Sequence, residues 1–196
     1  MRVAALIVAQ ALVAAEACAQ APYFPDVYLA PQYVAPTDAP PRVVVAGADE
    51  PGERLVVSGR VRDGGRPVAG VSVFVFQTDA DGFYAKGLTG NDAELDPRLR
   101  GAMRSDADGA YEFETIRPGH YDNNAAHVQY LVRAPGYHPL LLDLWFDDDP
   151  VLRARREAGT PEIPPSFPQN VVAIRPVTRD AAGVWRTTRD IELVRE

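Results

Sequence analysis

The chain has 196 residues, a formal net charge of −7 and one cysteine, Cys18. This length suits one domain with a core of its own. The acidic balance disfavours a nucleic-acid partner, because Lys86 is the single lysine and no Lys/Arg-rich patch is present to neutralise phosphates.

The N-terminal residues 1–19 are typical of a secretory signal. Arg2 precedes an apolar run, and residues 17–19 (Ala-Cys-Ala) form a small-residue cleavage site. The run is too short to anchor the chain across a bilayer. We therefore expect a periplasmic or secreted protein that, once cleaved, has neither a transmembrane segment nor a cysteine and needs no disulfide. A lipoprotein with Cys18 as the lipidated residue is the second interpretation, because Glu16 fits that motif poorly.

Residues 20–53 are rich in Pro, Ala and Tyr without a sustained period, which predicts an extended arm that wraps or leads into the domain; a loose linker is the alternative. From residue 54 onward the chain carries short alternating or β-branched segments bounded by Gly and Pro. The predicted strands are 55–61, 71–77, 111–116, 127–133, 140–146, 171–175 and 188–194. A helical pattern is confined to residues 150–158. Residues 54–196 are therefore predicted to be all-β, a single antiparallel β-sandwich with long loops.

Two tyrosines and one strand indicate a metal pocket. Tyr84 follows an Asp-Gly turn pair and Tyr121 follows a Pro-Gly pair, so both lie on loops. Because side chains alternate along a strand, His127 and Gln129 point to the same face. A phenol titrates near pKa ~10, so a tyrosinate at neutral pH needs a strong Lewis acid beside it. Two phenolates and an imidazole suit Fe(III), whose charge two tyrosinates and a hydroxide would cancel.

Each of these residues, considered alone, is more typical of packing. Tyrosines near turns commonly fill space while their hydroxyl finds a partner. A lone histidine on a strand is more commonly structural than a ligand. The functional interpretation depends on the set and its spacing.

The spacing resembles that of the intradiol ring-cleavage dioxygenases, the family that includes catechol and protocatechuate dioxygenases. The resemblance rests on five segments in the family's order, and it covers about two thirds of the chain. The segments are GRVRDGGRPVAGVSVFVFQTDADG, which leads to the first tyrosine, RSDADGAYEFETIRPGHY, AAHVQY, LLDLWFDDDP and RDIEL. It implies a β-sandwich, non-haem Fe(III), and insertion of both atoms of O2 into a small aromatic diol. It also implies that Tyr84, Tyr121 and His127 are ligands, with Tyr121 the tyrosinate displaced by the diol.

The chain departs from the family at three positions. Gln129 stands where the resemblance implies a second histidine ligand, Asn124 where it implies an arginine close to the substrate, and Asp143 where it implies a glutamine. The amide oxygen of Gln129 could still ligate Fe(III), although it is a weaker donor than imidazole. His120, beside Tyr121, is a remote alternative source of a nitrogen donor.

Two functions therefore remain open. One is an exported dioxygenase acting on a catechol-type aromatic; the other is a non-catalytic relative that has lost iron and binds a partner or envelope component. Small transthyretin-like sandwiches share part of the pattern but lack the Pro-Gly-x-Tyr…His pairing. A burgundy colour of the purified protein, from tyrosinate-to-iron charge transfer, would favour the enzyme.

Overall fold

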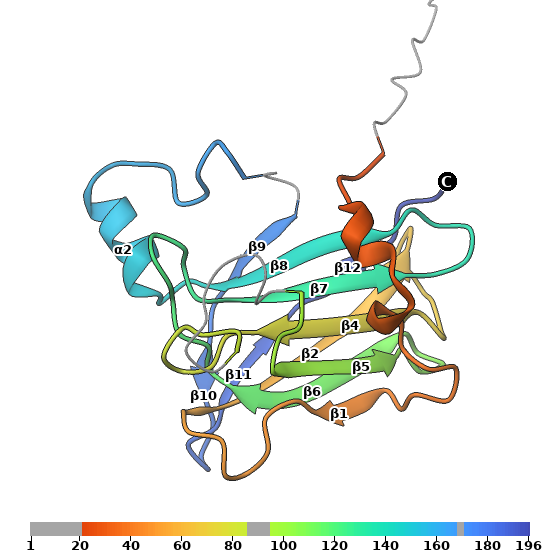
Figure 1. The fold of residues 1–196 in the computed structure, drawn as a ribbon, viewed down its shortest axis with the longest axis horizontal. Helices are drawn as coiled ribbons and strands as arrows, with labels where there is room; N and C mark the ends of the chain where they lie inside the picture. Colours follow the sequence, from red (N-terminus) through yellow and green to blue (C-terminus); the bar gives the residue numbers. More distant parts are fainter. Residues whose placement is uncertain (1–20, 86–94, 168–170) are drawn as a thin grey trace, which may run out of the picture.

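The computed structural model describes residues 21–85, 95–167 and 171–196. Two β-sheets lie face to face (Figure 1), as the predicted β-sandwich requires. Helix α2 (Pro150–Glu157) forms where a brief helix was predicted: Pro150 occupies its first turn, and the Asp149 side chain accepts a hydrogen bond from the Val151 backbone N–H. Across the described ranges no helix is long and apolar enough to cross a membrane.

The first sheet is built around the long strand β2 (Arg54–Asp63). Its strand order is β1-β6-β2-β11-β10, and two short strands, β3 and β12, also pair with β2. The bounds of the other members are β1 (Arg42–Val44), β3 (Arg66–Pro67), β6 (Ala110–Ile116), β10 (Thr178–Arg179), β11 (Trp185–Thr188) and β12 (Ile191–Glu192). Along β2 buried and partly exposed residues alternate, so one face of this sheet covers the core and the other meets solvent.

The second sheet carries the candidate site. Its strand order is β5-β4-β7-β8-β9. The bounds are β4 (Ser72–Gln77), β5 (Leu99–Arg104), β7 (His127–Arg133), β8 (Leu140–Phe146) and β9 (Val172–Arg175). Strand β4 is buried on both faces, which explains why its sequence is a continuous rather than an alternating apolar run.

The pairing is mixed where the prediction was purely antiparallel. Strands β1 and β6, β2 and β11, β2 and β12, and β8 and β9 pair in parallel, whereas the central pairs β2–β6, β4–β5, β4–β7 and β7–β8 are antiparallel. The predicted strand 188–194 is divided into β11 and β12. Between them the Arg189 N–H donates to the Ser58 carbonyl, and the Asp190 carboxylate accepts from the Arg60 N–H. The Asp190 side chain thus replaces a backbone acceptor and interrupts the strand.

The main core lies between the sheets. It combines Val57 and Phe113 of the first sheet with Val75, Tyr130 and Leu144 of the second, all at most 1% exposed. A second apolar cluster covers the opposite face of the second sheet, because Phe74 and Phe76 of β4 point away from the main core.

The N-terminal segment packs on that opposite face. It contains two short 3₁₀ helices, η1 (Asp26–Leu29) and η2 (Pro31–Tyr33). The rings of Tyr28 and Tyr33 lie 6.0 and 5.5 Å from those of Phe76 and Phe74. Residues 28–35 are therefore packed against the second sheet, and the Ala35 N–H also donates to the Ser72 hydroxyl. The predicted signal, residues 1–19, lies outside the described residues.

Candidate metal centre

Strand β7 provides two of the predicted site residues. Val128, Tyr130 and Val132 belong to the core between the sheets. Strand alternation therefore turns His127 and Gln129 to the opposite face of the second sheet, where the N-terminal segment and several loops cover them. Both side chains are largely buried, at 5% and 9% exposure.

Tyr84 and Tyr121 come from two turns that press against each other. The Gly119 N–H donates to the Asp79 carbonyl over 2.7 Å, and the Thr78 hydroxyl donates to the Gly119 carbonyl over 2.8 Å. A Cβ atom at Gly119 would lie 2.5 Å from the Ala80 carbonyl oxygen, and a Cβ at Gly82 would lie 2.4 Å from that of His120. Only glycine allows this approach, which explains the Asp-Gly and Pro-Gly pairs before the two tyrosines.

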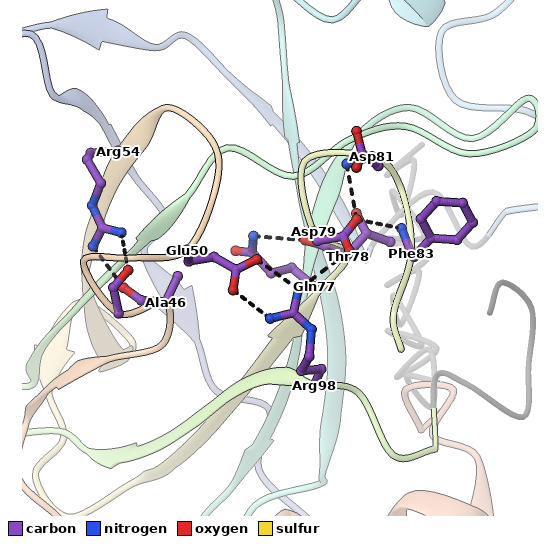
Figure 2. Close-up of polar contacts among 10 residues, drawn as sticks. Ala46, Glu50, Arg54, Gln77, Thr78, Asp79, Asp81, Phe83 and Arg98 are labelled. Carbon is purple, nitrogen blue, oxygen red and sulfur yellow. Dashed lines mark hydrogen bonds and ion pairs between the residues drawn. The ribbon is translucent and has the colours of Figure 1, made fainter. Parts of the chain in front are cut away.

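Asp79 and Arg98 organise the turn that leads to Tyr84 (Figure 2). The Asp79 carboxylate accepts from the N–H groups of Asp81 and Phe83, and it also receives the Arg98 guanidinium. Arg98 in turn donates hydrogen bonds from both terminal nitrogens to Glu50 of the N-terminal segment. Its own backbone N–H donates to the Tyr84 carbonyl. The pKa of Glu50 is lowered, chiefly by its hydrogen bond from Arg98, so the carboxylate stays ionised near neutral pH.

Helix α2 supports the turn that carries Tyr121. Arg155 donates to the Asn123 carbonyl, and its guanidinium lies 5.9 Å from the centre of the Trp145 ring. The turn closes with the Asn124 N–H donating to the Tyr121 carbonyl over 2.9 Å. Asp122 adopts a φ of 49°, which only a tight turn makes acceptable for a residue with a side chain.

The four predicted side chains converge at their polar ends. The Tyr84 hydroxyl lies 3.4 Å from the Tyr121 hydroxyl, 3.2 Å from His127 Nε2 and 3.1 Å from Gln129 Nε2. The Gln129 amide nitrogen is also 3.3 Å from His127 Nε2. Tyr84, at 1% exposure, is therefore the centre of the cluster.

The hydrogen bonding of His127 indicates its tautomer. Nδ1 lies 2.7 Å from the Ala125 carbonyl oxygen, which can only accept, so Nδ1 carries the proton in the neutral ring. Nε2 then presents a lone pair to the cluster. A backbone carbonyl that fixes the far nitrogen is the usual way in which a metal-binding histidine is oriented.

A cleft of about 830 Å³ opens onto the cluster. Tyr121, His127 and Gln129 lie at its base, and its walls come from the N-terminal segment and from strand β8. Tyr121 is partly exposed to this space whereas Tyr84 is enclosed beneath it. The other described lining residues are Tyr23, Pro25, Val27, Tyr28, Leu95, Asn124, Leu141, Asp143, Ser166, Phe167 and Val171.

The donor set fits a hard trivalent ion better than it fits zinc or calcium. Nowhere in the described ranges do three His, Cys, Asp or Glu side chains gather to hold a metal, so the phenols are needed. Donors that each lie roughly 2 Å from one ion are about 3 Å apart, close to the separations of 3.1–3.4 Å in this cluster. Gln129 fits less well, because its amide nitrogen faces the cluster and an amide ligates through oxygen. A half-turn of the amide would present Oε1.

The four predicted ligands meet, and Asn124 and Asp143 line the cleft beside them. His120 is exposed and is not among the described residues that line the cleft. Sequence reasoning missed the walls of the cleft, notably Tyr28 and Phe167. The residues around them carry no periodic pattern that would place them over the second sheet.

Comparison with known proteins agrees with this arrangement. Residues 28–158 match the family model described as "Dioxygenase". The chain is similar to the beta chain of protocatechuate 3,4-dioxygenase from Burkholderia cepacia, 51% identical over 73 residues that cover 36% of this chain and 31% of that protein. It is also similar to hydroxyquinol 1,2-dioxygenase from Rhizobium sp. (strain MTP-10005), 30% identical over 156 residues that cover 68% of this chain and 51% of that protein. The match thus spans about half of the length of the hydroxyquinol enzyme and about a third of the length of the protocatechuate enzyme chain.

A solved structure extends the likeness to the fold. The dioxygenase domain of a dioxygenase carbohydrate-binding protein fusion from the cellulolytic bacterium Streptomyces sp. SirexAA-E superposes with a TM-score of 0.61 at 27% identity. The match covers 83% of this chain and 94% of that domain. The sandwich of both sheets is therefore shared.

Proposed function

This chain belongs to the intradiol ring-cleavage dioxygenase family, and we propose that it inserts both atoms of O2 into a small catechol-type aromatic, using non-haem Fe(III). The observation that carries the proposal is the convergence of Tyr84, Tyr121 and His127 at the base of a cleft of about 830 Å³, a volume that suits a one-ring substrate. The names of the relatives add support, since each is a dioxygenase of a ring-hydroxylated aromatic.

Tyr84, Tyr121, His127 and Gln129 would hold the iron. When bound, Fe(III) supplies the Lewis acidity that ionises phenols and diols at neutral pH and prepares the ring for attack by O2. The two phenols would then contribute negative charge, which offsets the charge of the ion in a site that is largely closed to water.

The two tyrosines would have different duties, because they differ in exposure. Tyr84 is enclosed by the other three side chains, so its oxygen has no route to leave the cluster. The Tyr121 hydroxyl borders the cleft and can take the proton of an arriving diol hydroxyl. Tyr84 and His127 would meanwhile keep their positions as anchors.

The cleft would orient the ring. Tyr28 and Phe167 offer aromatic faces on its walls, and Leu141 adds an aliphatic contact. Such walls exclude water and leave the diol oxygens as the polar end of the substrate, directed to the base where Tyr121 and His127 lie.

The direct test is turnover by iron-loaded protein. Protein reconstituted with Fe(III) should be burgundy, and with catechol and isotopically labelled O2 it should yield a ring-opened dicarboxylic acid that carries both labelled atoms. Recovery of intact catechol from iron-bound, coloured protein would contradict the proposed reaction. A protein that neither binds iron nor colours after reconstitution would instead favour the non-catalytic relative.

We also propose that the protein is exported. The Arg2 start, the apolar run and the Ala-Cys-Ala end at residues 17–19 support this. N-terminal sequencing of the exported protein should begin at Gln20. A mature chain beginning at lipidated Cys18 would establish the lipoprotein interpretation, and an intact chain in the cytoplasm would contradict both.

A further inference from the structure

One peptide unit joins His127 to a buried carboxylate. The Ala125 carbonyl oxygen lies 2.7 Å from His127 Nδ1. The N–H of the same peptide unit, which belongs to Ala126, donates to the Asp149 carboxylate over 3.0 Å. The peptide is trans, so its carbonyl and its N–H point in opposite directions. Asp149, this peptide and the imidazole therefore form a continuous hydrogen-bond chain that ends at the tyrosine cluster.

The members of this hydrogen-bond chain are shielded from water. Asp149, His127 and the two alanines between them are at most 6% exposed. Leu152 of helix α2 belongs to one apolar cluster with Ala125 and Trp145. Hydrogen bonds in such surroundings are electrostatically stronger than in water, and successive bonds polarise one another. A change at Asp149 should therefore be felt at the imidazole.

Helix α2 holds the Asp149 carboxylate in place. Asp149 directly precedes the helix, and its other oxygen accepts from the Val151 N–H over 2.8 Å, so each carboxylate oxygen has a backbone donor. The partial positive charge of the helix N-terminus and an electrostatic interaction with Arg117 also compensate the burial of this group. The same side chain thus begins α2 and fixes the peptide that leads into β7.

We propose that Asp149 is a positioning residue for His127: through the peptide between Ala125 and Ala126 it holds Nε2 towards the cluster and makes Nε2 a stronger donor to iron. This inference rests on the proposed function in taking His127 as an iron ligand. A carboxylate that accepts from the peptide N–H makes the carbonyl oxygen of that peptide a better acceptor. A better acceptor for the Nδ1 proton raises the electron density at Nε2.

The first test uses the unsubstituted protein without iron, with isotope-labelled nitrogen for NMR. The ring nitrogen shifts of His127 should identify the tautomer with the proton on Nδ1. The Ala126 amide proton should resonate downfield and exchange slowly with solvent, because a carboxylate accepts it away from water. The opposite tautomer, with the proton on Nε2, would overturn the inference before any variant is made.

Asp149→Asn and Asp149→Ser interrupt the hydrogen-bond chain and keep the start of the helix. Asparagine and serine are both good N-cap residues, but each offers one oxygen in place of two and carries no charge. In both variants the Nδ1 proton of His127 should move upfield, because its hydrogen bond weakens. After reconstitution, iron affinity measured against a chelator should fall about 10-fold. The tyrosinate-to-iron absorption should move to longer wavelength, because a weaker nitrogen donor leaves the iron poorer in electrons.

Asp147→Asn is the matched control. It removes a carboxylate two residues earlier in the chain, and the Ala126 N–H donates to Asp149 rather than to this residue. The His127 signals, the iron affinity and the position of the absorption should all stay as in the unsubstituted protein. Equal changes in the control would overturn the inference, because they would reflect a general effect of charge.

The outcomes separate this inference from the proposed function. Unchanged His127 signals in folded Asp149→Ser, or unchanged iron affinity in both folded variants, would overturn the inference. If neither variant folds, the tautomer and the Ala126 proton of the unsubstituted protein decide it. Shifted signals and weaker iron binding in the variants, with no ring cleavage by the unsubstituted protein, would leave the inference standing and the proposed reaction wrong. Ring cleavage with unshifted signals would do the reverse.

Discussion

At the scale of single residues, the two tyrosines share a chemistry but not an environment. Tyr84 is enclosed and contacts all three of its partners, whereas Tyr121 borders the cleft. An enclosed phenol that contacts every other donor contributes to binding an ion throughout, while one at the cleft is free to exchange with substrate. Removal of the Tyr84 hydroxyl and removal of the Tyr121 hydroxyl should therefore have different consequences.

Tyr84→Phe should abolish both the burgundy colour and stable iron binding, because it removes the central oxygen of the cluster. Tyr121→Phe should retain part of the iron but lose turnover by about 100-fold or more, as expected when a proton-accepting group is removed. Iron content, visible absorption and oxygen uptake distinguish the two. Tyr130→Phe, on the core face of the same strand as His127, is the control and should keep colour and activity. Equal loss in both site variants would contradict the division of duties.

Gln129→His should strengthen the site. Position 129 already points to the cluster, with its amide nitrogen 3.1 Å from the Tyr84 hydroxyl, so an imidazole there needs no change of strand register. Because imidazole is a better donor than an amide, iron affinity should rise about 10-fold or more. Competition with a chelator measures this affinity, and the colour should deepen in parallel. A variant that remains colourless and free of iron would show that the site has decayed beyond one ligand.

At the scale of elements, the site depends on how closely two turns approach. The turn before Tyr84 and the turn before Tyr121 come from opposite sheets, after β4 and β6, and they meet through Gly82 and Gly119. Neither turn contains a donor cluster of its own. Their contact is what brings the two hydroxyls within 3.4 Å.

Gly119→Ala tests this contact. The new methyl group would lie 2.5 Å from the Ala80 carbonyl oxygen and 2.6 Å from the Gly82 nitrogen, both of them backbone atoms that cannot rotate away. The turns should separate, with a loss of about 1–3 kcal/mol in the free energy of unfolding and with weaker iron binding. Chemical denaturation and metal analysis measure the two effects. Gly47→Ala, where a Cβ meets nothing within 4 Å, should change neither by more than about 0.5 kcal/mol.

At the scale of the whole molecule, carboxylate–arginine pairs tie distant segments together. Arg98 joins Glu50 to the Tyr84 turn, and Arg117 after β6 joins Asp148 ahead of α2 through two hydrogen bonds. Five carboxyl groups have a pKa lowered chiefly by a hydrogen bond from an arginine: Glu50, Asp63, Asp148, Glu162 and Asp180. Most of these pairs are partly exposed, so each contributes little and salt weakens it.

The sign of this effect predicts acid lability. Because the folded-state pKa of each carboxyl is below its unfolded value, its stabilisation is complete above about pH 5 and is lost as the pH falls through the folded pKa. The midpoint of thermal unfolding should therefore not change near neutrality on account of these groups, and it should fall below about pH 5. Asp148→Asn should make that fall shallower, whereas Asp38→Asn, at an exposed site without an ion pair in the described ranges, should not. A curve that Asp148→Asn leaves unchanged would contradict the assignment.

Much of the fold follows from local signals, and the exceptions have physical causes. The strands at β4, β7 and β8 were predictable because their β-branched, aromatic and leucine-rich runs are continuous. Strand β5 (LRGAMR) has no such composition and becomes a strand because β4 offers it an edge over six residue pairs. The short β1 and β12 likewise depend on pairing with strands far away in sequence.

The sequence by itself determined that His127 and Gln129 share a face, because strand alternation is a local property of the backbone. It also determined that Tyr84 and Tyr121 lie at turns, because Asp-Gly and Pro-Gly pairs bend the chain within a few residues. Only the tertiary structure decided that the four side chains meet, because Tyr84 and Tyr121 are 37 residues apart in the chain. Their meeting requires contact between the turns around Gly82 and Gly119. It also decided that Asp143 lines the cleft, because β8 pairs with β7 in the register that sets Asp143 opposite Gln129.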